Sequence, residues 1–139
     1  MGSVEEYMST RMVTRNSKTS VLDLSKAMSE WKISSMAITD ENGTRVIGIL
    51  TERDVVNSVA KGMPPDKVSA GSLMSAPVSS VRSDVPIEEA ARLMIKKKVR
   101  HLLVEDAYHR IVGIITTTDL ARYLKQRVQT ESKSKSLSQ

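Results

Sequence analysis

The sequence predicts a mixed α/β (α+β) protein made of two similar units, each with the order strand, helix, strand, strand, helix. Three observations support this class. The second half of the chain repeats the first at a nearly constant spacing. Within each half, short apolar segments of strand length alternate with amphipathic helical segments. A linker with two consecutive prolines, Pro64 and Pro65, separates the halves, because prolines cannot continue a helix.

The repeat has two registers, separated by one lost residue. The first register has an offset of 66 residues, and the second, beyond a predicted turn, has an offset of 65. A gap in a turn is expected, since turns tolerate changes of length. We expect the two units to cover each other's apolar faces, giving one globule with pseudo-two-fold symmetry and a cleft along its axis. The matched pairs include Met8 and Met74, Ser9 and Ser75, Asp40 and Asp106, Gly48 and Gly113, Thr51 and Thr116, and Asp54 and Asp119.

The first unit begins with an extended segment at 12–14. A helix follows, for which Ser20 and Asp23 form a capping box. Two strands come next, and the Asn42-Gly43 pair between them is a strong hairpin signal. A last helix ends at Gly62. The predicted strands span 33–39 and 45–51, and the last helix spans 52–61.

The second unit follows the same plan. Pro86 suits the first turn of its first helix, with glutamates near the positive end and lysines near the negative end. The predicted extended segments are 78–81, 99–105 and 110–116, and the last helix runs from 117 to about 128. The predicted organisation is a first repeat at 1–62, a linker at 63–69, a second repeat at 70–128 and a mobile basic tail at 129–139.

Composition excludes several classes of protein. The 139 residues include no cysteine, which removes disulfide frameworks, thiolate zinc sites and cysteine nucleophiles. The N-terminus has no leader pattern and no apolar stretch is long enough to span a bilayer, so we expect a cytoplasmic protein without membrane contact. The net charge of +5 is concentrated near Lys96–Arg100 and in the tail. Nucleic acid is therefore a possible partner, although aromatic residues, at 3%, are too few for binding by base stacking.

One heptamer occurs at the second strand-to-helix junction of both units. The copies are 48–54, GILTERD, and 113–119, GIITTTD. A threonine followed three residues later by an aspartate is a common helix cap. This strand-to-helix junction, or corner, also suits a nucleotide. The free N–H groups at the start of the helix attract phosphate, and a carboxylate can accept hydrogen bonds from both hydroxyls of a ribose. The glycine would permit close approach of the backbone. These two interpretations are compatible.

At this heptamer the chain resembles the CBS (cystathionine-β-synthase) domain family. The nucleotide-binding signature of that family consists, in order, of a glycine, a hydrophobic residue, any residue, a threonine or serine, any two residues, and an aspartate. The order of elements and the Met-Ser pair that opens each unit are also similar to the family, and the resemblance covers the chain from Val4 to about Val128. It implies one or two adenosine-binding sites per chain and a disc-shaped homodimer.

The resemblance also implies roles for individual residues. Asp54 and Asp119 would hold ribose hydroxyls, and Thr51 and Thr116 would contact sugar or phosphate. Adenine would lie against main chain and apolar side chains, and basic residues would face the phosphates. The adenine set is Met12, Val13, Ser35, Met36 and Ala37 in one site, and Val78, Ser79, Leu102 and Leu103 in the other; the basic set is Arg53, Arg100 and His101.

Two departures from the family pattern affect the expected ligand. Ala37 and Leu103 stand where many members have a proline, and Thr117-Thr118 replaces the frequent Glu-Arg pair. The second site therefore lacks a local arginine, so the phosphate number of its ligand stays open.

The sequence thus predicts a regulatory module that binds AMP, ADP, ATP or an adenosyl derivative in the cleft between two repeats. We expect no enzymatic activity, since no base is positioned beside a serine or threonine, and no metal site, since two histidines alone rarely form one. No cofactor is expected beyond the regulatory nucleotide, and the regulated protein is unknown. Two alternatives stay open: a nucleic-acid-binding protein that uses its basic surface and tail, and an interaction scaffold with empty clefts.

Overall fold

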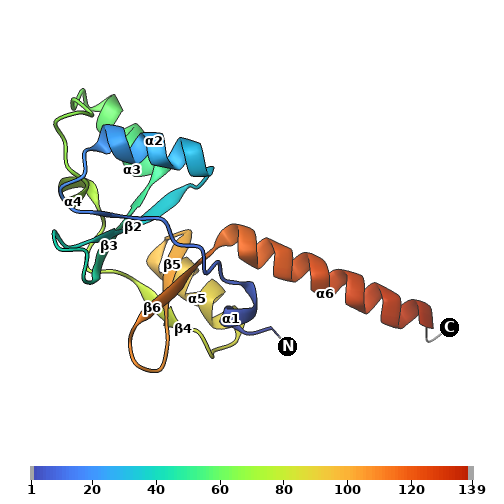
Figure 1. Ribbon diagram of the computed structural model, residues 1–139. Helices are drawn as coiled ribbons and strands as arrows, with labels where there is room; N and C mark the ends of the chain where they lie inside the picture. The colour runs from blue at the N-terminus through green and yellow to red at the C-terminus, as the bar shows by residue number, and fades with distance from the viewer. Residues whose placement is uncertain (1, 138–139) are drawn as a thin grey trace. The chain divides into compact units, whose positions relative to one another are not determined.

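The computed structural model describes residues 2–137, with side chains as far as residue 133. The described residues form a mixed α/β fold with two three-stranded sheets, which confirms the predicted class (Figure 1). They divide into two compact units. The central unit comprises Arg11–Ser79, and the terminal unit combines the residues up to Thr10 with those from Ser80 onward.

In the central unit the sheet order is β1-β2-β3, with β1 parallel to β2 and β2 antiparallel to β3. These strands are β1 (Thr14–Asn16), β2 (Ser35–Thr39) and β3 (Val46–Thr51). The helices are α2 (Val21–Trp31), α3 (Glu52–Ala60) and the short α4 (Ala70–Leu73). Ser20 caps α2 by accepting a hydrogen bond from the Asp23 backbone N–H at 3.1 Å. The predicted strand and helix order of the first unit is therefore present.

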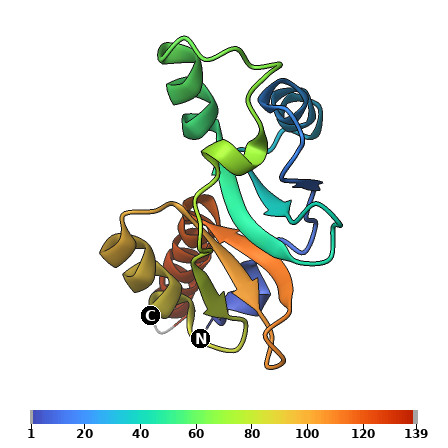
Figure 2. The same ribbon diagram turned by 90° about the vertical axis from the view of Figure 1, so that its left-hand side faces the viewer.

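The terminal unit repeats this topology, with sheet order β4-β5-β6 (Figure 2). Its strands are β4 (Ser80–Arg82), β5 (His101–Glu105) and β6 (Ile111–Thr116). Its helices are α1 (Val4–Tyr7), α5 (Ile87–Lys97) and α6 (Thr117–Leu137). Both α2 and α5 end at a lysine with left-handed backbone, Lys32 and Lys98.

Each unit has its own apolar core, and each core includes a residue from the opposite sequence repeat. Val4 is fully buried in the terminal core, among residues such as Ile87 and Leu102. Ala70 is fully buried in the central core, beside Leu24 and Leu50. The short helices α1 and α4, which the sequence analysis did not predict, supply these residues. Sequence repeats and compact units therefore divide the chain at different places.

The Met-Ser pairs complete this exchange of segments. Ser9 forms an antiparallel bridge with Ile114, and Ser75 forms one with Ile49. In each pair the serine exchanges backbone hydrogen bonds with the outer strand of the sheet, β6 or β3, at the residue that follows the glycine of the heptamer. A Cβ at Gly113 would lie 2.7 Å from the Ser9 carbonyl oxygen, and one at Gly48 would overlap the Met74 side chain. The heptamer glycine therefore makes room for the chain segment that pairs with the edge of the sheet.

The end of the chain differs from the prediction. Helix α6 continues to Leu137, beyond the predicted end near Val128, so most of the segment 129–139 is helical and residues 138–139 lie outside the described part. No glycine or proline follows Val128, and Lys, Gln and Glu favour helix. Arg127 and Glu131, one helical turn apart, form an ion pair at 3.5 Å that also stabilises the helix. Between residues 2 and 137, no helix combines the length and apolarity that crossing a membrane requires.

Candidate functional site

The predicted site residues of the central unit gather at one edge of its sheet. Because β1 and β2 are parallel and β3 returns antiparallel, the starts of β1 and β2 lie at the same edge as the end of β3. Ser35 pairs with Thr51, and Thr14 pairs with Ala37. Met12 and Val13 directly precede Thr14. Residues far apart in the sequence are thus brought together there.

The terminal unit has the same arrangement. His101, at the start of β5, pairs with Thr116 at the end of β6, and Ser80 pairs with Leu103. Val78 and Ser79 precede β4 but fall within the bounds of the central unit. Each sheet edge is followed at once by a helix, α3 or α6, whose first turn carries the aspartate of the heptamer.

The two aspartates act as helix caps with matching geometry. Thr51 donates to Asp54 Oδ2 from its backbone N–H at 2.9 Å and from its hydroxyl at 3.1 Å. Thr116 donates to Asp119 Oδ2 in the same two ways, at 2.8 and 3.2 Å. Asp54 also returns a backbone bond to the Thr51 hydroxyl, which completes a capping box. The predicted capping role is therefore present at both corners, and all these bonds end on a single carboxylate oxygen.

The second carboxylate oxygen distinguishes the corners. In the terminal unit Arg122 donates to Asp119 Oδ1 at 3.3 Å and also to the Tyr7 carbonyl at 2.7 Å. The equivalent residue in the central unit is Asn57, and within residues 11–79 no side chain donates to Asp54 Oδ1. A ligand hydroxyl can therefore reach this oxygen of Asp54 without displacing a neighbour from its own unit.

Successive residues of a strand lie on opposite faces of its sheet, so the apolar residues assigned to adenine fall into two groups. Met36 and Leu102 point into the central and terminal cores, respectively. Ala37 and Leu103, one position further along, lie on the opposite face of each sheet. At Met36 and Leu102, only main-chain groups can therefore meet a ligand.

The three basic residues assigned to phosphate lie at different places. Arg53 is exposed in the first turn of α3, next to Asp54. Arg100 is exposed just before β5, and its carbonyl accepts a bond from the Thr117 N–H at 3.1 Å. His101 is half-buried at the first position of β5.

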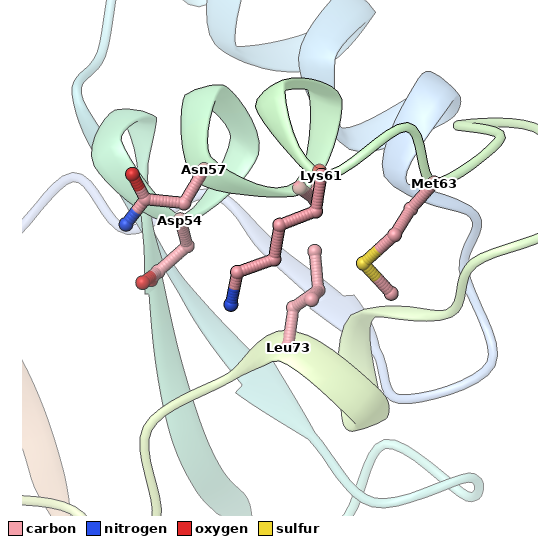
Figure 3. Close-up of a pocket in the computed structure, with 6 residues that line it drawn as sticks. Asp54, Asn57, Lys61, Met63 and Leu73 are labelled. Atoms are coloured by element: carbon pink, nitrogen blue, oxygen red, sulfur yellow. The ribbon is translucent and has the colours of Figure 1, made fainter.

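A pocket lies between α3 and α4 in the central unit, with a volume of about 160 Å³ (Figure 3). Four of its residues come from α3 and its end, at positions i, i+3, i+4 and i+7, and therefore share one helix face. The pocket is lined by Asp54, Asn57, Ser58, Lys61, Met63 and Leu73. Of these residues, only Asp54 was predicted from the sequence. The helical spacing from Asp54 was the signal that would have identified the other α3 residues.

Over the described residues, no group of three or more histidines, cysteines or carboxylates is arranged to hold a metal ion. His109 lies 3.5 Å from Glu105 on an exposed turn, which is the contact of an ordinary surface residue.

The fold and the duplicated corner define a tandem repeat of one strand-helix-strand-strand-helix motif, and the comparisons with known proteins identify the motif. The model of the CBS domain matches residues 4–61 and 70–126. The chain therefore belongs to the CBS domain family, with two domains in tandem.

Relatives agree with this assignment. An uncharacterized protein of Methanopyrus kandleri is 34% identical over 135 residues, which cover 94% of this chain and 68% of that protein. Among solved structures, the CBS domain pair of the protein MJ0100, in complex with 5′-methylthioadenosine and S-adenosyl-L-methionine, matches with a TM-score of 0.81 and 27% identity, over 91% of this chain and 98% of that one. The protein CBSX2, in complex with AMP, matches with a TM-score of 0.73 and 27% identity, over 89% and 96% of the two chains.

Proposed function

We propose that this chain is a regulatory module, without catalytic activity of its own, that binds an adenosine nucleotide or adenosyl compound at its Thr-x-x-Asp corners. The observation that carries the proposal is the duplication of one corner geometry, with Asp54 and Asp119 held alike in the first turns of α3 and α6. The bound ligands of two structural neighbours, 5′-methylthioadenosine with S-adenosyl-L-methionine and AMP, support the adenosine part.

The chemistry of the corner suits a ribose. A carboxylate has about four lone-pair sites, and the capping bonds at Asp54 and Asp119 occupy those of one oxygen. The other oxygen of Asp54 can accept a ribose hydroxyl, and that of Asp119, which already accepts a bond from Arg122, keeps a second lone pair for one. Charge-assisted bonds of this kind are stronger than neutral ones. The nearby N-terminus of the helix adds a positive potential that favours phosphate.

We also propose that the module works as a homodimer in the cytoplasm and signals ligand binding to a protein that it regulates. Exposed apolar side chains on α3 and α6 support the dimer, because solvent-facing valines and leucines on adjacent helical turns are typical of an interface. The set comprises Val56, Val59, Leu124 and Val128, whose exposed fractions lie between 56% and 63%.

Ligand titrations test the proposal. Thermal unfolding of the full chain is followed with AMP, ADP, ATP, 5′-methylthioadenosine and S-adenosylmethionine, and the affinities are measured by calorimetry. We expect at least one compound to raise the melting temperature, because any ligand specific for the native state stabilises it. No shift with any of the five compounds at millimolar concentration contradicts the proposal.

Two matched variants assign the corners. Asp54→Ala and Asp119→Ala each remove one carboxylate and one cap, at a cost of about 1 kcal/mol in unfolding free energy. Each is expected to weaken binding at its own corner by about tenfold or more. Asp66→Ala, in the exposed linker, is the control for loss of a charge. Normal affinity in both corner variants, with early melting, would mean that the aspartates serve only as caps.

A further inference from the structure

The pocket between α3 and α4 exists because small side chains in the central unit replace large ones in the terminal unit. On the repeat register, Leu73 corresponds to Tyr7, Asn57 to Arg122, Ser58 to Tyr123, and Lys61 to Gln126. Three of these four exchanges remove a ring or a guanidinium group from the central unit. The volume that those groups would fill is the pocket of about 160 Å³.

In the terminal unit the same four positions contact one another. The Tyr7 hydroxyl donates to Gln126 Oε1 at 2.6 Å, and the Tyr7 and Tyr123 rings meet edge to face at 5.3 Å. The Arg122 guanidinium lies 5.5 Å from the centre of the Tyr7 ring, in addition to its bonds to Asp119 and the Tyr7 carbonyl. The polar groups around Asp119 are therefore already engaged with one another.

In the central unit the corresponding groups remain available. Lys61 follows the last residue of α3, and its side chain extends back along the helix toward Asp54, above Leu73 (Figure 3). Within residues 11–79 its ammonium group forms no ion pair. A carboxylate and an ammonium group thus line one pocket without neutralising each other, and this arrangement suits a ligand that carries both hydroxyl donors and a negative charge.

We infer that the central corner selects an adenosine nucleotide with a 5′-phosphate, and that Lys61 is the phosphate-binding residue. The inference rests on the proposed function and adds its charge specificity. A nucleotide whose ribose hydroxyls donate to Asp54 carries its phosphate on the other side of the sugar, within the span of a pocket that Asp54 and Lys61 both line. Asn57, also in the lining, offers an amide N–H to the same group. The terminal corner has Gln126 in place of Lys61, so it lacks this charge.

A pair of ligands that differ at the 5′ position isolates the phosphate contact. AMP and 5′-methylthioadenosine share adenine and ribose, but only AMP carries a phosphate. Their affinities for the full chain are measured by calorimetry, for the wild type and for Lys61→Gln, which copies the terminal unit. We expect Lys61→Gln to lower the affinity for AMP by about tenfold and to leave that for 5′-methylthioadenosine unchanged, because only a charge-assisted bond to phosphate is lost.

Two further variants control for charge and shape. Lys61→Arg keeps the positive charge and should retain most of the preference for AMP. Lys67→Gln removes an exposed lysine of the linker, outside the pocket lining, and should change neither affinity. An unchanged ratio of the two affinities in Lys61→Gln overturns the assignment of Lys61 while the proposed function stands. A wild-type chain that binds 5′-methylthioadenosine at least as well as AMP also overturns it, and a chain that binds neither compound contradicts the proposed function itself.

Discussion

The central and terminal units share a topology and a capped Thr-x-x-Asp corner, yet they differ in what surrounds the aspartate. Around Asp119, Arg122 and Tyr7 form a connected set of bonds and ring contacts. Around Asp54, the smaller Asn57 and Leu73 leave a pocket that is also lined by Lys61, whose ammonium group forms no ion pair within residues 11–79. The duplicated motif therefore fixes the backbone of the corner, while side chains outside the motif determine its charge and its free space.

The two units also differ in the surroundings of their heptamer glycines, where the largest effects on stability are expected. A Cβ at Gly113 would meet the Ser9 carbonyl oxygen, which is backbone, whereas a Cβ at Gly48 would meet the flexible Met74 side chain. We expect Gly113→Ala to lower the free energy of unfolding by about 3 kcal/mol and Gly48→Ala by about 1 kcal/mol. A backbone oxygen can move away from the new methyl group less easily than a flexible side chain can. Urea denaturation of both variants measures the difference. Equal losses would show that the segments beside the two glycines adapt equally in the two units.

The packed set around Tyr7 gives the next largest effect. Tyr7→Leu copies Leu73 and removes both the bond to Gln126 and the edge-to-face contact with Tyr123. The expected loss is about 2 kcal/mol, from a cavity and a lost polar contact. The reciprocal change, Leu73→Tyr, should cost little stability and should reduce AMP binding, because it fills the pocket of the central unit. If Tyr7→Leu and the wild type unfold at the same urea concentration, the contacts of Tyr7 do not stabilise the terminal unit.

Local rules predicted the fold well, and the comparison of units shows why. The strand alternation, the Ser20 cap and the Thr51–Asp54 and Thr116–Asp119 pairs depend on residues within a few positions of one another. Such interactions are set by spacing and by side-chain type, so they can be read from the sequence alone.

Contacts between distant segments were not predicted. No local pattern indicates that Val4 enters the core of the second repeat, or that Ser9 pairs with the edge strand β6. The pocket residues were missed for another reason. Helical spacing places Asn57 and Lys61 on the face of Asp54, but the pocket itself results from differences between the repeats, where Arg122 and Gln126 stand in the terminal unit, and not from the shared heptamer.

The hairpin turns of the two units differ in length but use an aspartate in the same way. The pKa of Asp40 is lowered mainly by a hydrogen bond from the Thr44 side chain. The pKa of Asp106 is lowered mainly by a hydrogen bond from the Arg110 backbone N–H. Because each folded pKa lies below its unfolded value, the stabilisation is complete above the unfolded pKa and is lost as pH falls through the folded pKa. We expect Asp40→Asn and Asp106→Asn to be less stable than wild type at pH 7, and the difference to shrink below about pH 4. Denaturation at several pH values measures it, and a difference that does not change with pH would contradict the role of these carboxylates.

The smallest effect on stability is expected in the part of α6 beyond the second repeat, because the central unit has no corresponding segment. Truncation before Thr130 removes the Arg127–Glu131 pair and an exposed helical end, while every residue that lines the central pocket stays in place. The expected change in unfolding free energy is below about 0.5 kcal/mol, because an exposed ion pair of this kind contributes little. Affinity for AMP should be unchanged.

The same truncation tests the alternative that the basic charge serves nucleic acid. It removes Lys133 and Lys135 from a chain of net charge +5, so weak binding to duplex or single strands should fall. In the intact chain this binding should decrease steeply with salt, because release of counterions drives it. Retention of tight, salt-resistant and sequence-dependent DNA binding would favour a nucleic-acid function over the nucleotide sensor. Loss of AMP binding on truncation would instead show that α6 takes part in the ligand site, either in its own chain or in a dimer partner, and the central unit could then no longer be regarded as holding the whole phosphate site.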